Sequence, residues 1–422
     1  MRAKRRAAAI VLAALLGAVA CGAQGIALTV RVFPQNAALT VDGELIPART
    51  GVSVGPNTEP RVLALEAGAH SIHLAAAGYQ PKDLAVSLSL ELTLEVKLER
   101  EGSRLAKRSE MPTGREPKSV EFTPDSRFIV CALLEGEGVE VIPTDGTSGR
   151  LALAPPATWA AKKGFVEMAF LTGRQELWVT QMTTGMVHVF GLSDFAWLAS
   201  FSTGGSWSKF ILASPDEKTA YVSNWESRDV SVIDKGSRSA TARIPVGGVP
   251  RGLALSRDGR FLYVCLFDRG AVQKIDLAKR AVAKSLAFGE GAMRHIVMHP
   301  TQDILYVSDM LRGRVLVIDA ASDALAAEIR VDRNPNTITL SPDGRYLFVS
   351  SRGPNNPEDY TKKGPAFATI SCIDTHSRAV VDWTWGKNQP TGLAVSPDGR
   401  TIAFTNFLDN QIEVYAFSPG GG

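Results

Sequence analysis

Basic and polar side chains recur along this 422-residue chain at positions that a repeat would make equivalent. In the middle of the chain they lie 42 or 43 residues apart. The set is Lys118, Val166, Lys209, Arg251, Arg294, Asn336 and Thr391. Cationic groups gathered around one opening attract and concentrate an anionic ligand. The first chemistry that these residues suggest is therefore the binding of an anion.

A second set of positions follows the first, fifteen residues further along each repeat. Its occupants are Leu133, Gln181, Asn224, Leu266, Asp309, Ser351 and Asn406, and Trp225 and Phe267 come directly after two of them. Polar groups beside aromatic rings suit a ligand surface. The predicted ligand contacts are Lys118, Lys209, Arg251, Arg294, His295, Asn336, Asn224, Trp225, Asp309 and Asn406.

An alternative interpretation needs no ligand. Loop aspartates would pair with the basic residues and neutralise them, at about 0–1 kcal/mol for each surface pair. The aspartates concerned are Asp229, Asp268, Asp309 and Asp409.

Motifs for catalysis and for cofactors were sought in the same way. The sequence contains no Cys-x-x-Cys-His, no Gly-x-Ser-x-Gly and no glycine-rich phosphate loop. His295 and His299 flank a strand-like run, where four residues at about 3.3 Å each separate them too far for one metal ion. His70 and His73 would face opposite sides of a strand. We therefore expect no catalytic residue, no metal site and no cofactor.

A repeat of about 42 residues organises most of the chain. A turn of the type Ser-Pro-Asp-Gly recurs, an apolar strand follows it, and a third strand often ends in Ile-Asp. The second residue of the turn falls at Pro124, Thr172, Pro215, Arg257, Pro300, Pro342 and Pro397. Three or four short strands per unit, repeated seven times, predict an all-β fold, a seven-bladed β-propeller.

Several repeat strands carry a recognisable signature, AYVSN at 220–224, LYVSD at 305–309 and SPDGRYLFVS at 341–350. With the Ile-Asp pairs they resemble the YVTN-repeat, or YncE-like, β-propeller family over residues 104–418. The resemblance implies the fold, but it implies no single activity because members of one fold differ in role.

Closure of the ring is predicted from the last repeat. Its strands, near 391–395, 401–405 and 411–417, leave no outer fourth strand before the chain ends. We expect Arg104–Glu110 to supply that strand, which removes an exposed sheet edge. Glu99–Ser103 would then be a short hinge.

One repeat is longer than the others, and the extra residues fall in Arg352–Phe367. A long polar loop on the same face as the basic residues predicts a lid or a partner contact through Asn355, Asp359, Tyr360 and Lys363. The alternative is an insertion that the fold merely tolerates.

The start of the chain predicts export. Residues 1–20 have a basic beginning, an apolar middle and small residues before Cys21, as a secretory signal peptide has. The pattern resembles a bacterial lipoprotein signal, with Ala18 where a larger aliphatic residue is usual, and implies lipidation of Cys21. The alternative is ordinary cleavage that leaves a soluble exported protein. Without these residues, which contain four basic groups and no acid, the formal charge falls from +3 to −1, so net charge does not indicate nucleic acid binding.

Residues 26–100, after a linker at 21–25, alternate between apolar and polar side chains and predict a small β-sandwich. Asp42-Gly43 is a hairpin turn signal, and VDG with LEAGAHSIHLAAAGYQP resembles the PEGA domain. Cys131, Cys265 and Cys372 lie in apolar strands and are expected to be buried thiols.

These features favour a non-catalytic exported protein, in the periplasm or at the cell surface and anchored through Cys21. Its partner would be an envelope protein, or an anionic small molecule or polymer. The alternative is a propeller enzyme, either a lactonase-like hydrolase or an oxidoreductase with a non-covalent cofactor.

Overall fold

The computed structural model describes residues 25–34, 36–47, 61–145, 149–154, 156 and 163–420. The predicted signal peptide and Cys21 lie outside the described residues. The chain divides into two compact units, a smaller one that ends at Leu98 and a larger one that contains Glu99–Gly422.

The smaller unit consists of two β-sheets. One has the order β4-β1-β7 and the other β3-β2-β5-β6. The strands are β1 (Ile26–Phe33), β2 (Ala38–Val41), β3 (Glu44–Ile46), β4 (Arg61–Leu65), β5 (Gly68–Ala75), β6 (Lys82–Leu88) and β7 (Leu92–Lys97). The β2–β3 hairpin turns at Asp42-Gly43, and both residues have the positive φ that the sequence signal predicts. His70 contacts Asp42 and His73 contacts Asp83, so the two histidines share no partner.

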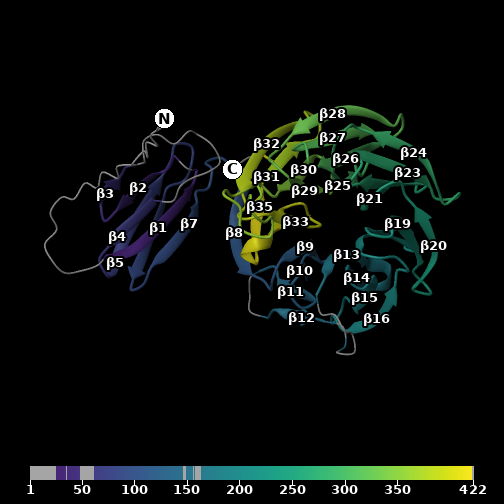
Figure 1. Ribbon diagram of the computed structural model, residues 1–422, viewed down its shortest axis with the longest axis horizontal. Helices are drawn as coiled ribbons and strands as arrows, with labels where there is room; N and C mark the ends of the chain where they lie inside the picture. Colours follow the sequence, from purple (N-terminus) through teal and green to yellow (C-terminus); the bar gives the residue numbers. More distant parts are fainter. Residues whose placement is uncertain are drawn as a thin grey trace, which may run out of the picture. The chain divides into compact units, whose positions relative to one another are not determined.

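The larger unit is a ring of seven four-stranded antiparallel sheets, which confirms the predicted β-propeller (Figure 1). Blade 1 has β9 (Pro117–Phe122), β10 (Phe128–Leu133), β11 (Val139–Pro143) and β12 (Leu151–Leu153). Blade 2 has β13 (Phe165–Leu171), β14 (Glu176–Gln181), β15 (Met186–Gly191) and β16 (Trp197–Ser202). Blade 3 has β17 (Ser208–Ala213), β18 (Thr219–Asn224), β19 (Asp229–Asp234) and β20 (Ser239–Pro245).

The remaining blades repeat this order. Blade 4 has β21 (Pro250–Leu255), β22 (Phe261–Leu266), β23 (Ala271–Asp276) and β24 (Ala281–Ala287). Blade 5 has β25 (Met293–Met298), β26 (Ile304–Asp309), β27 (Arg314–Asp319) and β28 (Ala324–Arg330). Blade 6 has β29 (Pro335–Leu340), β30 (Tyr346–Ser351), β31 (Thr369–Asp374) and β32 (Ala379–Trp385). Blade 7 has β33 (Pro390–Val395), β34 (Thr401–Asn406), β35 (Gln411–Phe417) and β8 (Leu105–Pro112).

Strand β8 closes the ring, as the sequence predicts. It pairs with β35 in an antiparallel register that runs from Gln411 opposite Pro112 to Phe417 opposite Leu105. Leu105 and Met111 are buried by this pairing. The outer edge of blade 7 is therefore covered by residues that precede the whole repeat.

Residues of the predicted hinge, Glu99–Ser103, contact blade 6. Ser103 Oγ and Arg104 N both donate to the buried carboxylate of Asp382 in β32. Arg100 pairs with the same carboxylate at 2.6 Å and lies over the ring of Trp383. A buried carboxylate needs partners, and these residues supply them.

Neighbouring blades share their cores. Between blades 2 and 3, for example, Trp178 and Val189 pack with Ile211 and Val222. Each sheet buries its faces only against the next sheet, as repeat architectures require. The three cysteines of the larger unit are buried free thiols, as expected.

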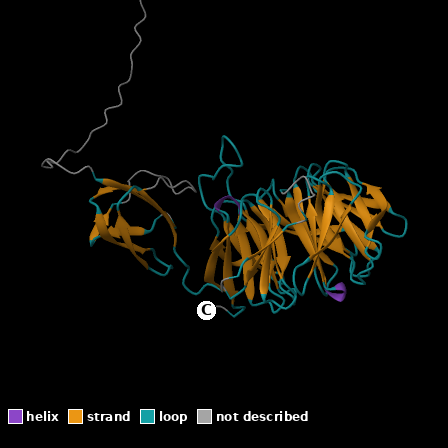
Figure 2. Ribbon diagram, turned by 90° about the horizontal axis from the view of Figure 1, so that it is seen from below, coloured by secondary structure: helices purple, strands orange, loops and turns teal. Residues whose placement is uncertain are grey.

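The loops divide between two faces of the propeller (Figure 2). The long β30–β31 loop rises on the same face as the short 3₁₀ helix η2 (Phe407–Asp409), whereas η1 (Thr172–Arg174) lies on the opposite face.

Candidate functional site

The basic residues predicted from the repeat come together at the centre of the ring. Each is the second residue of an innermost strand, so the ring places one such residue in every blade. Arg251, Arg294, Asn336 and Thr391 are buried there, whereas Lys118 and Lys209 are partly exposed. The structure thus brings the predicted set to one place, which we call the ring positions.

A hydroxyl of the preceding blade fixes the backbone at several ring positions. Ser223 Oγ donates to the carbonyl of Arg251 at 2.8 Å and accepts from the amide of Phe210 in its own blade at 3.1 Å. Thr180, Ser308 and Ser350 make equivalent bonds to the ring carbonyls of Lys209, Asn336 and Thr391. At these four ring positions the hydroxyl of the repeat signature therefore links adjacent blades and fixes the backbone of the ring residue.

Removing one of these hydroxyls should cost stability. Ser223→Ala leaves the Arg251 carbonyl and the Phe210 amide without this partner inside the protein, which should lower the free energy of unfolding by about 1–3 kcal/mol. Denaturant unfolding of the variant measures this loss. Ser193→Ala, at an exposed turn position, is the control and should change it by less than about 0.5 kcal/mol. Equal stability of the two variants would contradict the linking role.

Arg251 is the most deeply placed cation. Its side chain is 2% exposed, and Nη2 donates to Glu167 Oε1 of blade 2 at 3.2 Å. Nε and Nη1 are buried and have no hydrogen-bond partner. Since buried donors are nearly always satisfied, these two are available for a ligand.

Lys209 and Lys118 lie on aromatic rings. Lys209 Nζ is 4.1 Å from the ring centroid of Trp225, which packs on Phe267, and Lys118 Nζ is 5.0 Å from that of Phe407. Burial, and after it the charge of Arg251, lowers the pKa of Lys209 to about 7. Burial lowers the pKa of Lys118 well below its usual value, as do nearby Arg352 and Arg251.

Arg352 joins this group, although the sequence analysis did not place it there. It follows β30 at the root of the inserted loop, donates through Nη2 to Gln389, and lies 5.5 Å from the ring of Phe407. Its Nε is buried without a partner, and burial lowers its pKa to about 10. A signal existed, because Arg352 occupies the repeat position where Trp225, Phe267 and Phe407 stand.

Two carboxyl groups and a histidine complete the arrangement. Burial, followed by the charge of Glu167, raises the pKa of Glu121 to about 8. Burial also raises the pKa of Glu167, against the opposing effect of Arg251. His295 packs edge-on against Phe210, and burial followed by Arg251 lowers its pKa to about 3, so it is neutral near pH 7.

We call the whole group the central cluster. Several members, such as Glu167 with 16% of its side chain exposed, are reached by solvent. Besides Arg251 and Arg352, the unpartnered buried atoms include His295 Nδ1 and Asn336 Nδ2. The members are Lys118, Glu121, Glu167, Lys209, Arg251, His295, Asn336 and Arg352.

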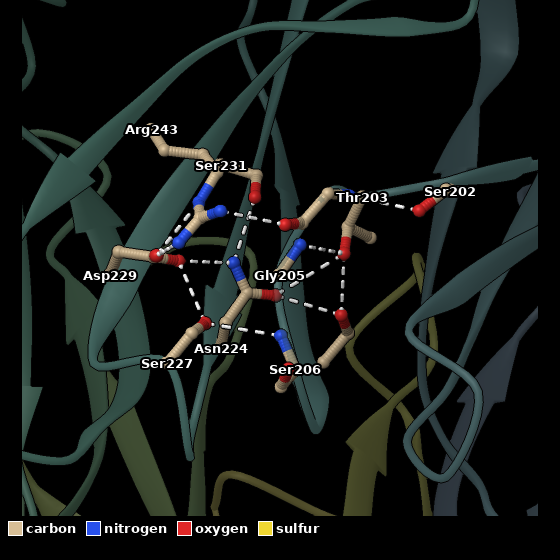
Figure 3. Close-up of polar contacts among 11 residues, drawn as sticks. Ser202, Thr203, Gly205, Ser206, Asn224, Ser227, Asp229, Ser231 and Arg243 are labelled. Atoms are coloured by element: carbon tan, nitrogen blue, oxygen red, sulfur yellow. Dashed lines mark hydrogen bonds and ion pairs between the residues drawn. The ribbon is translucent and has the colours of Figure 1, made fainter.

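Polar residues of the second predicted set make hydrogen bonds within their own blades instead. Figure 3 shows the side chain of Asn224 enclosed within blade 3. Its Oδ1 accepts from Ser208, and its Nδ2 donates to Asp229 and Ser231, at 2.7–2.8 Å. Gly205 passes so close that a Cβ there would lie 2.1 Å from Asn224 Cγ. Asn224 is fully buried and satisfied, which corrects its assignment as a ligand contact.

Asp309 and Asn406 behave in the same way. Asp309 accepts from Arg314 Nε at 2.9 Å and is fully buried. Asn406 donates to Glu413 at 2.8 Å and accepts from the amide of Lys387. Their bonds hold the second and third strands together. Trp225, which follows Asn224, contacts the central cluster through Lys209.

The loop aspartates pair with residues away from the ring positions. Asp229 pairs with Arg243, Asp309 with Arg314, and Asp268 lies 3.6 Å from Arg269. Asp409 pairs with Lys363 and accepts from Asn388. The alternative in which these aspartates neutralise the basic set is therefore not what the structure shows.

The inserted loop is tied down at two points. Lys363 Nζ lies 2.6 Å from Asp409 Oδ1, and Gln389 Nε2 donates to the carbonyl of Tyr360 at 2.6 Å. Asp359 caps a local turn by accepting from Thr361. The side chain of Tyr360 is 63% exposed and Asn355 is exposed. Because Gln389 also accepts from Arg352, one side chain connects the loop with the central cluster.

Two surface grooves lie elsewhere. One, of about 320 Å³, is lined by Thr123, Phe128 and Phe195 between blades 1 and 2. The other, of about 480 Å³, is lined by Arg257, Phe261 and Lys274 between blades 4 and 5. Neither groove contains a residue of the central cluster.

Two absences concern the described residues, 25–34, 36–47, 61–145, 149–154, 156 and 163–420. No helix among them is long and apolar enough to cross a membrane. Within the same ranges, no group of three or more His, Cys, Asp or Glu side chains could hold a metal ion.

Comparisons with known proteins agree on the fold. Residues 271–422 match the family model described as "Lactonase, 7-bladed beta-propeller". Antigen Lp49 of Leptospira interrogans is 39% identical over 354 residues, which cover 82% of this chain and 77% of that protein. The seven-bladed beta-propeller protein Rv1057 of Mycobacterium tuberculosis is 28% identical over 162 residues, covering 37% of this chain and 38% of that protein.

More distant proteins share the architecture. A 6-phosphogluconolactonase of an Enterobacter strain is 21% identical over 227 residues, covering 50% of this chain and 67% of that protein. A hydrazine synthase chain of Kuenenia stuttgartiensis superimposes with a TM-score of 0.61 at 19% identity, over 72% of this chain and 96% of that chain. At such identities the likeness extends to the fold alone.

Proposed function

This chain belongs to the lactonase-type family of seven-bladed β-propellers, and we propose that it is an exported, lipid-anchored, non-catalytic protein that binds an anionic ligand at its central cluster. The finer assignment to YVTN-repeat proteins with a PEGA-like module rests on the sequence signatures described above. Antigen Lp49 is described as an antigen, which agrees with a protein displayed outside the cytoplasm.

The observation that carries the proposal is the guanidinium of Arg251. It is buried, and one of its three nitrogens pairs with the carboxylate of Glu167. The other two nitrogens have no partner. A buried charge with unused donors is costly unless something pairs with it. An anion that accepts from Nε and Nη1 would satisfy both donors and the surrounding positive charge.

The affinity for such an anion should fall as the pH rises. Lys209 loses its proton near pH 7 and Glu121 near pH 8, so each step makes the central cluster less positive. Sulfate keeps its charge over this range and is therefore the probe. We expect calorimetric titration at low salt to show sulfate binding that weakens about tenfold or more between pH 6 and pH 9.

Two variants separate the contribution of Lys209 to this pH dependence from any general effect of pH on the protein. Lys209→Arg keeps the charge at all these pH values and should flatten the pH dependence, whereas Lys279→Gln, at a site 79% exposed, should leave it unchanged. No sulfate binding at any pH in the wild-type protein would refute the proposed function.

The affinity for the anion falls as the pH rises, whereas the stability of the ligand-free protein should rise. Between pH 7 and the usual lysine value of 10.5, the unfolded chain holds a proton on Lys209 that the folded protein lacks. The free energy of unfolding therefore rises with pH across that window, as far as Lys209 determines it.

The inserted loop suggests an envelope protein as the partner of the same face. Its residues Asn355 and Tyr360 are exposed, and the Lys363–Asp409 pair attaches the loop to η2. Pull-down from envelope extracts should recover a partner with the full chain and lose it when residues 353–366 are replaced by a short glycine linker. Recovery by both proteins would exclude the loop as the contact.

A second candidate function is lactone hydrolysis, which the matching family model makes worth testing. The specific observation in its favour is that Glu121 stays protonated near pH 7 close to Glu167, as a proton donor would. A pH-stat assay with δ-gluconolactone, comparing wild-type protein with Glu121→Gln, tests it. Turnover lost in the variant would favour the enzyme over the binding protein. An absorbance spectrum of the purified protein tests the oxidoreductase alternative.

A further inference from the structure

We propose that the ligand of the central cluster carries two separate anionic groups, one held by Arg251 with Lys209 and the other by Lys118 with Arg352. This inference rests on the proposed anion-binding function and names the ligand class. The shared chemistry is that of a small dicarboxylate or a compound with two phosphate groups.

The balance of charge supports more than one anionic group. The central cluster contains four basic side chains, Lys118, Lys209, Arg251 and Arg352, and two carboxyl groups. Glu121 is protonated near pH 7, which leaves Glu167 as the negative charge, and it already pairs with Arg251. Below pH 7, where Lys209 carries its proton, a single monovalent anion would leave an excess of buried positive charge.

Three of the four basic side chains rest on aromatic rings and not on carboxylates. Lys209 lies over Trp225, and both Lys118 and Arg352 lie over Phe407. An aromatic face stabilises a cation by about 0.5–2 kcal/mol and, unlike a carboxylate, does not neutralise it. These cations are therefore held in position and remain able to pair with an anion.

The aromatic rings also divide the cations into two groups. Phe407 of blade 7 gathers Lys118 from blade 1 with Arg352 from blade 6. Arg251 of blade 4 and Lys209 of blade 3 stand on adjacent innermost strands. Each group offers an unpartnered buried donor, Arg352 Nε in one and Arg251 Nε and Nη1 in the other. One anionic group at each place satisfies both sets of donors.

Matched pairs of probes test the inference. Succinate is compared with acetate, and pyrophosphate with sulfate, by calorimetric titration at pH 7 and low salt. We expect each two-group probe to bind at least tenfold more tightly than its one-group counterpart. Which pair binds more tightly overall distinguishes a carboxylate ligand from a phosphate ligand.

Variants test whether Lys118 binds the second anionic group of the ligand. Lys118→Met should reduce the preference for succinate over acetate to less than about threefold while acetate affinity stays nearly unchanged. Arg251→Gln should weaken all four probes. Arg127→Gln, at an exposed turn with 73% of its side chain accessible, is the control and should behave as wild type. Unfolding curves identify any variant that fails to fold, and Lys118→Gln then replaces Lys118→Met.

A second readout is proton uptake. At pH 7.5 succinate carries no proton, so any proton taken up on binding, measured in buffers of different ionisation enthalpy, goes to the protein. We expect uptake that is lost in Lys209→Arg, since Lys209 is the group that gains charge beside the ligand. If two-group and one-group probes bind equally, the inference fails while the proposed function stands. If no probe binds, both fail.

Discussion

A chain that begins at Thr113 should lose the stable propeller, whereas a chain that begins at Glu99 should keep it. The shorter chain lacks β8, which pairs with β35 at seven residue positions and buries Leu105 and Met111. Each buried side chain contributes about 1.5–3 kcal/mol and each hydrogen bond about 0.5–1.5 kcal/mol. The loss is on the order of 5 kcal/mol or more, comparable with the whole stability of an ordinary domain.

Thermal unfolding followed by circular dichroism measures this difference. The chain from Glu99 retains Ser103 and Arg104 on Asp382, so it should unfold cooperatively near the wild-type temperature. The chain from Thr113 should aggregate or unfold at a much lower temperature, because an unpaired edge of β35 is exposed. Similar unfolding temperatures for the two chains would mean that β8 does not close the ring in solution.

Arg251→Gln should lower the affinity for a bound anion by on the order of 100-fold or more, the second large effect that the structure predicts. A hydrogen bond to a charged group contributes about 1.5–3 kcal/mol, and Arg251 offers two free donors. Calorimetric titration with sulfate at pH 6 measures the loss. An unchanged affinity would place the anion elsewhere.

Removing both charges of the Arg251–Glu167 pair should abolish anion binding without lowering the stability of the ligand-free protein. In the double variant Arg251→Met with Glu167→Gln, an interblade ion pair of 3.2 Å is replaced by uncharged side chains. Such replacements are often neutral or stabilising by a few kcal/mol. We expect the double variant without ligand to be at least as stable as wild type and unable to bind sulfate. That combination would show that the buried charge serves binding and not the fold.

The periodic part of the architecture could be predicted from the sequence. Every repeat contributes a strand that buries its faces against the next blade, so the apolar pattern and the turn residues recur at a fixed interval. The ring positions of Lys118, Arg251 and Arg294 follow from the same periodicity, as does closure by β8.

The remainder of the site depends on side-chain direction, which the repeat does not encode. Asn224 stands at a regular repeat position, yet its side chain turns into its own blade to meet Asp229. Glu167 lies at a bulge that recurs in the other innermost strands, where Phe210 and Gly252 occupy its position, so its approach to Arg251 follows from its side chain and not from the spacing. Arg352 stands at a regular repeat position where residues such as Trp225 and Phe407 are apolar, so its charge is not part of the repeat pattern.

The repeat signature itself has a physical explanation that sequence reasoning did not reach. The hydroxyl of Ser223 binds the next blade at the carbonyl of Arg251, so the motif that identifies the fold also positions the site. In blade 4 a buried thiol, Cys265, stands where Ser223 stands in blade 3.

The most direct measurement is a crystal structure of the protein grown with tungstate, whose anomalous scattering marks the anion. We expect a strong anomalous peak within hydrogen-bonding distance of Arg251 Nε and Nη1, at the centre of the seven innermost strands. A structure in which those two nitrogens are bonded to protein carboxylates, with tungstate absent from the centre, would contradict the account.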